Sequence, residues 1–115
     1  MKPPIILNDG GDLIFFASVE DVEQCLEVID VERGAHIAYD SEGRLVKVGV
    51  AKQRGMFSGT KRVVVQDAES EPTHAAELRD TLVDFFSRAG ESQEWLASAS
   101  LGDLVRRGLE RHRMR

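Results

Sequence analysis

The side chains that could act as nucleophiles, bases or metal ligands are few and widely separated in this chain. Cys25 is the single cysteine, and the histidines are His36, His74 and His112. A catalytic thiol needs a base beside it, and zinc sites use closely spaced ligands such as HExxH or CxxC. Neither arrangement occurs in the sequence. We therefore expect no catalytic residue, metal or cofactor, and we expect Cys25 to be a core residue.

Carboxylates, by contrast, recur at helical spacing between Ser18 and Glu32. The apolar residues of this segment also follow a helical repeat: Val19, Val22, Leu26 and Ile29. The two repeats predict an amphipathic helix with a buried apolar face and an exposed acidic face. Such a face can attract a basic protein, although it is also the ordinary solvated side of a helix. The predicted partner-binding residues are Glu20, Glu23, Glu27, Asp30 and Glu32, with Tyr39 as an anchor.

The acidic residues are concentrated in the first part of the chain. Residues 1–50 contain ten Asp or Glu and four Lys or Arg, whereas residues 51–115 contain ten and eleven. The formal net charge is -5. An acidic excess disfavours general nucleic-acid binding and favours a basic protein partner.

A basic loop supports an alternative function. Residues 52–60, KQRGMFSGT, contain two glycines and are followed by two further basic residues. Backbone N–H groups and cations in such loops can bind phosphate, but the glycine spacing matches neither a P-loop nor a dinucleotide motif. The alternative is a regulatory or anion-binding domain that uses Lys52, Arg54, Lys61 and Arg62. The arginines from Arg106 to Arg115 have a simpler explanation, because basic residues favour the C-terminal end of a helix.

Five segments have the composition of short β-strands bounded by turn residues: 4–7, 13–16, 36–40, 45–50 and 61–66. Asn8–Asp12 and Ser41–Arg44 predict the turns of two hairpins. Helices are predicted at about 19–29, with Ser18 as N-cap, at about 73–89, ending at Gly90, and from Ser100 onwards, with a short turn at 94–97. The resulting order, β-β-α-β-β-β-α-α, predicts an α+β fold in which two to three helices pack on one face of an antiparallel sheet of about five strands.

The length of the chain, 115 residues, predicts a single domain over 1–115 with one modest core. The apolar run near the N-terminus is too short for a signal peptide or a membrane span. One cysteine cannot form an internal disulfide, which favours a reducing compartment. We therefore expect a cytoplasmic protein without a membrane partner.

The segment from Ser18 to Val48 resembles immunity factors of bacterial polymorphic-toxin and contact-dependent inhibition systems. The resemblance rests on the capped acidic helix followed by the sequences IDVERG and AYDSEGR. It implies a small cytoplasmic α+β domain that binds and neutralises one cognate toxin without catalysis. We therefore predict a non-enzymatic protein-binding module, with the anion-binding domain as one alternative. A structural homodimer, joined through an open sheet edge or the last helices, is the other.

Overall fold

The computed structural model describes residues 1–34, 36–52 and 60–112. Within these ranges the chain forms five strands and five helices. The strands are β1 (Ile5–Asp9), β2 (Asp12–Phe16), β3 (His36–Tyr39), β4 (Leu45–Lys52) and β5 (Lys61–Ala68). The helices are α1 (Val19–Cys25), α2 (Val28–Arg33), α3 (Ala75–Arg88), α4 (Gln93–Ser98) and α5 (Leu101–His112).

The strands form one antiparallel sheet in the order β2-β1-β3-β4-β5, which confirms the predicted α+β class and five-stranded sheet. The turn between β1 and β2 contains Gly10 and Gly11 at φ values of 62° and 103°, a region that favours glycine. β5 continues to Ala68, two residues beyond the predicted end. An irregularity of the β4–β5 pairing between Lys47 and Val48 lets the ladder resume in a shifted register.

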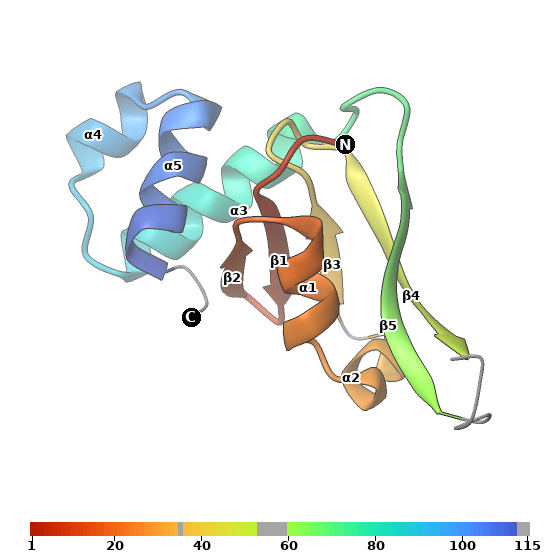
Figure 1. The fold of residues 1–115 in the computed structure, drawn as a ribbon. Coiled ribbons are helices and arrows are strands. Elements are labelled where there is room, and N and C mark those ends of the chain that lie inside the picture. Colours follow the sequence, from red (N-terminus) through yellow and green to blue (C-terminus); the bar gives the residue numbers. More distant parts are fainter. Residues whose placement is uncertain (35, 53–59, 113–115) are drawn as a thin grey trace.

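Helices cover both faces of the sheet, so the predicted one-sided arrangement with two to three helices is wrong (Figure 1). Strand β1 shows why. Ile6 belongs to a buried cluster with α3, α4 and α5, whereas Ile5 and Leu7 belong to a second cluster with α1. A strand buried on both faces has a continuous apolar run, and Ile5-Ile6-Leu7 is such a run. The sheet therefore divides the predicted single core into two clusters.

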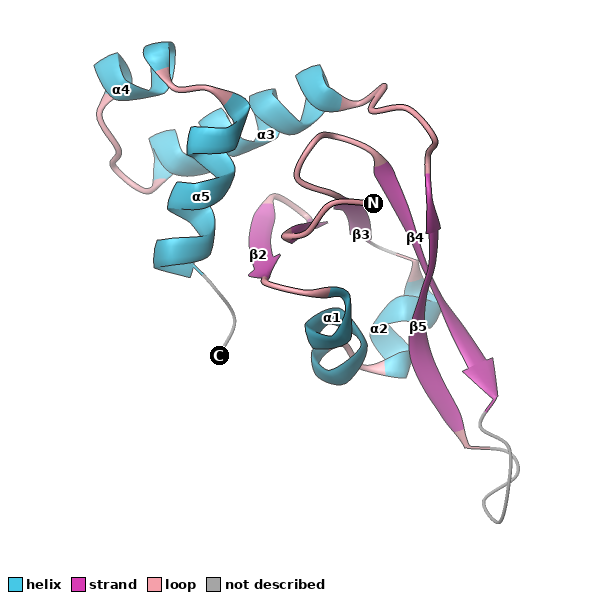
Figure 2. Ribbon diagram, turned by 45° about the horizontal axis from the view of Figure 1, so that its top comes forward, coloured by secondary structure: helices cyan, strands magenta, loops and turns pink. Residues whose placement is uncertain are grey.

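The sheet curves around α1. This helix contacts both β2 and β5, which are the first and last strands of the sheet (Figure 2). Among the described residues, β3 and β4 pair at two positions, Ala38 with Val46 and Tyr39 with Leu45. The two strands separate beyond these pairs, and α2 contacts β4 and β5.

The single helix predicted for residues 19–29 is two short helices. Ser18 caps α1 as predicted, because its Oγ accepts a hydrogen bond of 3.2 Å from the N–H of Asp21. The chain then becomes extended at Leu26, and α2 begins at Val28. The break changes which residue points inward: Ile29 is 54% exposed, whereas Val31 is buried. The predicted inward position of Ile29 was wrong because it assumed one straight cylinder.

The C-terminal helices follow the predicted local signals. Gly90 has a φ of 89° just after α3, and Ser100 and Asp103 exchange hydrogen bonds of 3.1 and 3.3 Å at the start of α5. α5 packs closely on β2 at Gly108, where an added Cβ would overlap the Phe15 ring. None of the helices in the described ranges is both long enough and apolar enough to cross a membrane.

Candidate protein-binding surface

Four of the five predicted acidic residues are exposed, and three of these four form no ion pair with another described residue. Glu20 lies on α1, Glu27 lies directly before α2, and Asp30 lies on α2; all three are exposed. None of them takes part in the ion pairs that the described residues form. These three carboxylates are hereafter called the acidic surface.

Glu23 does not belong to this surface, contrary to the prediction. It is half-buried, and its Oε2 accepts a hydrogen bond of 2.8 Å from the backbone N–H of Val65. Val65 lies on β5, the last strand of the sheet, and no further strand of the described residues pairs with its outer edge. A side chain that occupies an edge N–H removes one position at which another chain can pair. Glu23 therefore has a role within the fold.

Glu32 also has a partner within the chain. Its Oε2 lies 3.0 Å from Nζ of Lys61, a residue of the predicted anion-binding set. Lys61 is opposite Lys52 in the β4–β5 hairpin, but Arg62 points to the other face because successive strand side chains alternate. Arg54 lies outside the described residues. The described part of the hairpin therefore does not bring its basic residues together in one anion site.

Tyr39 is a core residue, so its prediction as a surface anchor was wrong. The side chain is 1% exposed, and its hydroxyl donates a hydrogen bond of 2.7 Å to Oε2 of Glu77. Burial and the adjacent Glu77 carboxylate raise the pKa of Tyr39 far above its usual value. The hydrogen bond ties β3 to α3 across the face that α3 covers.

The AYDSEGR sequence organises a turn around Asp40, which is fully buried. Its carboxylate accepts hydrogen bonds from the backbone N–H groups of Lys2, Glu42 and Arg44, at 2.9 to 3.0 Å, and from the Arg44 guanidinium, at 3.2 Å. Burial opposes ionisation, but these hydrogen bonds outweigh it and hold the pKa of Asp40 below its usual value. This sequence therefore has a structural explanation.

The arginines of α5 that the structure describes also have partners within the chain. Arg107 and Arg111 each lie 2.7 Å from the carboxylate of Glu91, and the Arg107 guanidinium lies 4.1 Å from the centre of the Trp95 ring. Such ion pairs and cation–π contacts stabilise packing. They hold α5 against Glu91, which lies between α3 and α4, and against Trp95 on α4.

A small cleft, hereafter the Asp9–Asp30 cleft, opens beside the acidic surface with a volume of about 220 Å³. It lies between the α1–α2 break and the β1–β2 hairpin. The lining residues form an apolar floor (Leu7, Ile14 and Leu26) and a polar rim (Asp9, Asp30, Arg33 and His36). Sequence reasoning found Asp30 but missed the other three rim residues. No local pattern links Asp9 to Asp30, because the sheet and the helix break bring them together.

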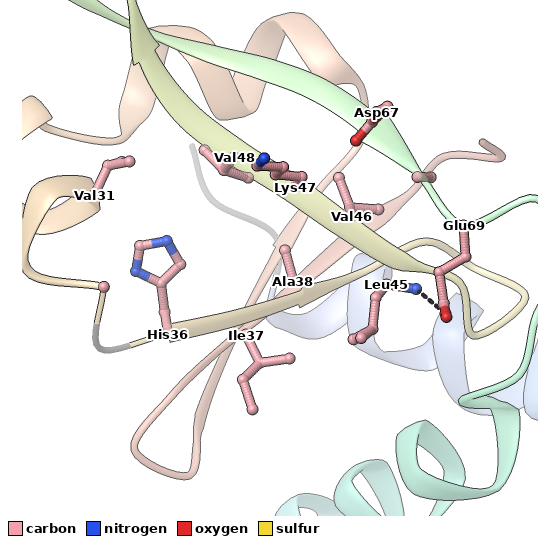
Figure 3. Close-up of a pocket in the computed structure, with 12 residues that line it drawn as sticks. Val31, His36, Ile37, Ala38, Leu45, Val46, Lys47, Val48, Asp67 and Glu69 are labelled. Atoms are coloured by element: carbon pink, nitrogen blue, oxygen red, sulfur yellow. Dashed lines mark hydrogen bonds between the residues drawn. The ribbon is translucent and has the colours of Figure 1, made fainter.

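A larger hollow of about 530 Å³ lies where β3 and β4 separate (Figure 3). Ala38 and His36 extend from β3 on the side of β4, and Ile37 points the opposite way. At the end of the hollow where β3 and β4 pair, the N–H of Leu45 donates a hydrogen bond of 2.8 Å to Oε1 of Glu69. His36 lines both hollows, and α2 contributes residues to each.

Neither hollow contains a hydroxyl or thiol nucleophile among its described lining residues. What they offer is apolar contact beside carboxylate charge. The chain matched no known protein family, no curated protein and no solved structure.

Proposed function

We propose that this chain is a non-enzymatic, cytoplasmic protein-binding module that binds a basic protein through the acidic surface of α1 and α2. The observation that carries the proposal is the exposure of Glu20 on α1, Glu27 directly before α2 and Asp30 on α2, outside the ion pairs of the described residues. Unpaired carboxylates on neighbouring segments repel one another and contribute little to the stability of the fold. The same carboxylates would attract a basic partner, which would associate faster than a neutral or acidic protein.

Within this class, we propose an immunity-type inhibitor that neutralises a cognate toxin. The support for this more specific function is the resemblance of Ser18 to Val48 to immunity factors. The partner would then be a toxin with a basic binding surface. Its binding should depend strongly on salt, because salt screens the attraction between exposed charges.

The test compares two double charge reversals in the full chain. The partner is first recovered by pull-down and mass spectrometry from the source cell, and its association is then followed by stopped flow at low and moderate salt. We expect Glu20→Lys with Glu27→Lys to slow association roughly tenfold at low salt and to weaken its salt dependence. The matched control, Glu71→Lys with Glu110→Lys, makes the same change in net charge at exposed positions outside α1 and α2.

Equal association rates for the two double variants would show that the acidic surface is not part of the binding site. Thermal unfolding of both variants shows whether the fold is intact. If the partner recovered carries no basic surface, the proposal is also wrong.

The described residues favour neither an anion site in the β4–β5 hairpin nor a homodimer through the β5 edge. An anion site would need Lys61 and Arg62 to converge, but Lys61 pairs with Glu32 and Arg62 lies on the other face. A homodimer through the β5 edge would compete with the hydrogen bond from Val65 to Glu23. A thermal-shift screen with inorganic phosphate and light scattering over a range of protein concentrations test these alternatives directly.

A further inference from the structure

We infer that the Asp9–Asp30 cleft binds one arginine side chain of the basic partner, an inference that rests on the proposed function. The acidic surface would attract the partner, and the cleft would then hold a single side chain of it. The shape of the cleft, the charge of its rim and its position support this assignment.

The size of the cleft suits one side chain. Pockets for drug-sized ligands measure roughly 300–1,000 Å³, whereas this cleft measures about 220 Å³. Its floor consists of Leu7, which is 2% exposed, and the partly buried Ile14 and Leu26. An apolar floor can cover the methylene groups of an arginine while the charged end stays at the polar rim.

The charge of the rim is complementary to a cation. Asp9 and Asp30 are exposed and take part in none of the ion pairs among the described residues. Two further exposed carboxylates are close in the chain: Asp12, which pairs with Asp9 in the hairpin, and Glu27, which precedes α2. The lining residues include two aspartates and one arginine, Arg33, so carboxylates outnumber arginine and lysine around the cleft.

The geometry favours arginine over lysine. A guanidinium is planar and presents several N–H donors, so it can donate to two carboxylates at once or to both oxygens of one. An ammonium group is a compact point charge that loses more hydration on entering a cleft. The rim holds one carboxylate from the hairpin and one from α2, and the several N–H donors of a guanidinium suit such acceptors better than a single ammonium does.

The position of the cleft links it to the acidic surface. Asp30 belongs to both, and Leu26, where α1 ends, lies on the cleft floor. The break between α1 and α2 therefore opens the cleft at the acidic surface. A protein that docks on α1 and α2 would therefore lie beside the cleft.

The test uses a defined probe and the full chain. N-acetyl-L-arginine methylamide is titrated into ¹⁵N-labelled protein, and amide chemical shifts are recorded by NMR. We expect saturable shifts at Leu7, Ile14, Leu26 and Asp30. The citrulline analogue has nearly the same shape but no charge, and it should bind at least tenfold more weakly. The lysine analogue should also bind more weakly than the arginine probe.

Variants locate the effect. Asp9→Asn with Asp30→Asn should weaken binding of the arginine probe at least tenfold, whereas Glu71→Gln with Glu110→Gln should not. The dispersion of the NMR spectrum shows whether the double variant folds. If it does not fold, the Asp30→Asn variant and the comparison of arginine with citrulline still test whether the cleft binds the probe. Equal binding of arginine and citrulline, shifts confined to another surface, or full binding by the cleft variant would overturn the assignment.

Failure of this inference is distinguishable from failure of the proposed function. The probe experiment needs no partner, so it tests the cleft alone. With the partner in hand, the cleft variant should increase the dissociation rate, whereas the Glu20 and Glu27 reversals should act on association. An unchanged dissociation rate would reject the cleft while leaving the acidic surface in place.

Discussion

Glu23 and Glu20 lie one helical turn apart on α1, yet only one of them is free to act as a surface charge. Glu23 accepts the backbone N–H of Val65, 42 residues further along the chain, and Glu20 lies outside the ion pairs of the described residues. A hydrogen bond to a charged acceptor contributes more than one between neutral groups. The same type of side chain therefore serves the fold at one position and is available for binding at the other.

We predict that Glu23→Ala lowers the free energy of unfolding by about 1–2 kcal/mol, because the N–H of Val65 loses its charged acceptor. Urea unfolding measures the loss, and faster amide exchange at Val65 localises it. Glu23→Gln keeps an acceptor oxygen and should retain part of the stability. The control is Gln24→Ala, the exposed neighbouring residue in the same helix, which should change stability by less than about 0.5 kcal/mol. Equal stability of the Glu23→Ala and Gln24→Ala variants would contradict this role.

At the scale of elements, short helices are positioned by what lies beneath them. α1 ends at Cys25 and α2 places Val31 inward, so the acidic residues are spread over two helix axes. α5 is positioned differently, because Gly108 lets its backbone approach the ring of Phe15 on β2. A close approach of this kind fixes both the distance of the helix from the sheet and its rotation about its own axis.

We predict that Gly108→Ala destabilises the protein by about 1–3 kcal/mol, because the new methyl group would force Phe15 to move within a packed cluster. Gly102→Ala is a matched control in the same helix, since the nearest atom to its added Cβ is Oγ of Ser100 at 3.8 Å. Alanine there should raise stability by up to about 1 kcal/mol through its higher helix propensity. Thermal or urea unfolding compares the two. Similar effects at both positions would show that α5 does not pack on Phe15 as described.

At the scale of the whole molecule, the turn around Asp40 joins distant parts of the chain. Its carboxylate binds the N–H of Lys2 near the N-terminus, and Gly43 in the same turn lies against Ala75 at the start of α3. The carbonyl of Gly43 also accepts a hydrogen bond of 3.0 Å from the N–H of His74. One buried carboxylate thus helps to hold the N-terminus and the β3–β4 turn together. The same β3–β4 turn contacts the residues at the start of α3.

We predict that this carboxylate makes stability depend on pH. The pKa of Asp40 is lower in the folded than in the unfolded chain, where it is about 3.9. Its contribution is therefore fully present well above pH 3.9 and is lost as the pH falls through the folded pKa. Asp40→Asn should be less stable than the wild type at pH 7 by about 1–3 kcal/mol, and the difference should shrink below about pH 4. Urea midpoints from pH 7 to pH 2 measure both curves, and a constant difference would reject the proposed role of the charge.

Local patterns in the sequence determined the strands, the Ser18 and Ser100 caps and the end of α3 at Gly90, because each depends on residues within about four positions of one another. The same patterns gave wrong predictions where contacts between distant segments determine the structure. The apolar run in β1 is buried by helices on both faces of the sheet, although helices on one face were predicted. The apolar repeat through Ile29 predicted one helix, although the chain becomes extended at Leu26.

The composition of the acidic segment was thus readable from the sequence, but the availability of each carboxylate was not. Glu23 is bound to Val65, Glu32 to Lys61 and Tyr39 to Glu77, and these partners lie 42, 29 and 38 residues apart. Only the tertiary structure brings such pairs together and leaves Glu20, Glu27 and Asp30 outside the ion pairs of the described residues. Helical spacing describes the neighbours along one element, whereas a hydrogen bond or ion pair depends on which element lies across from it.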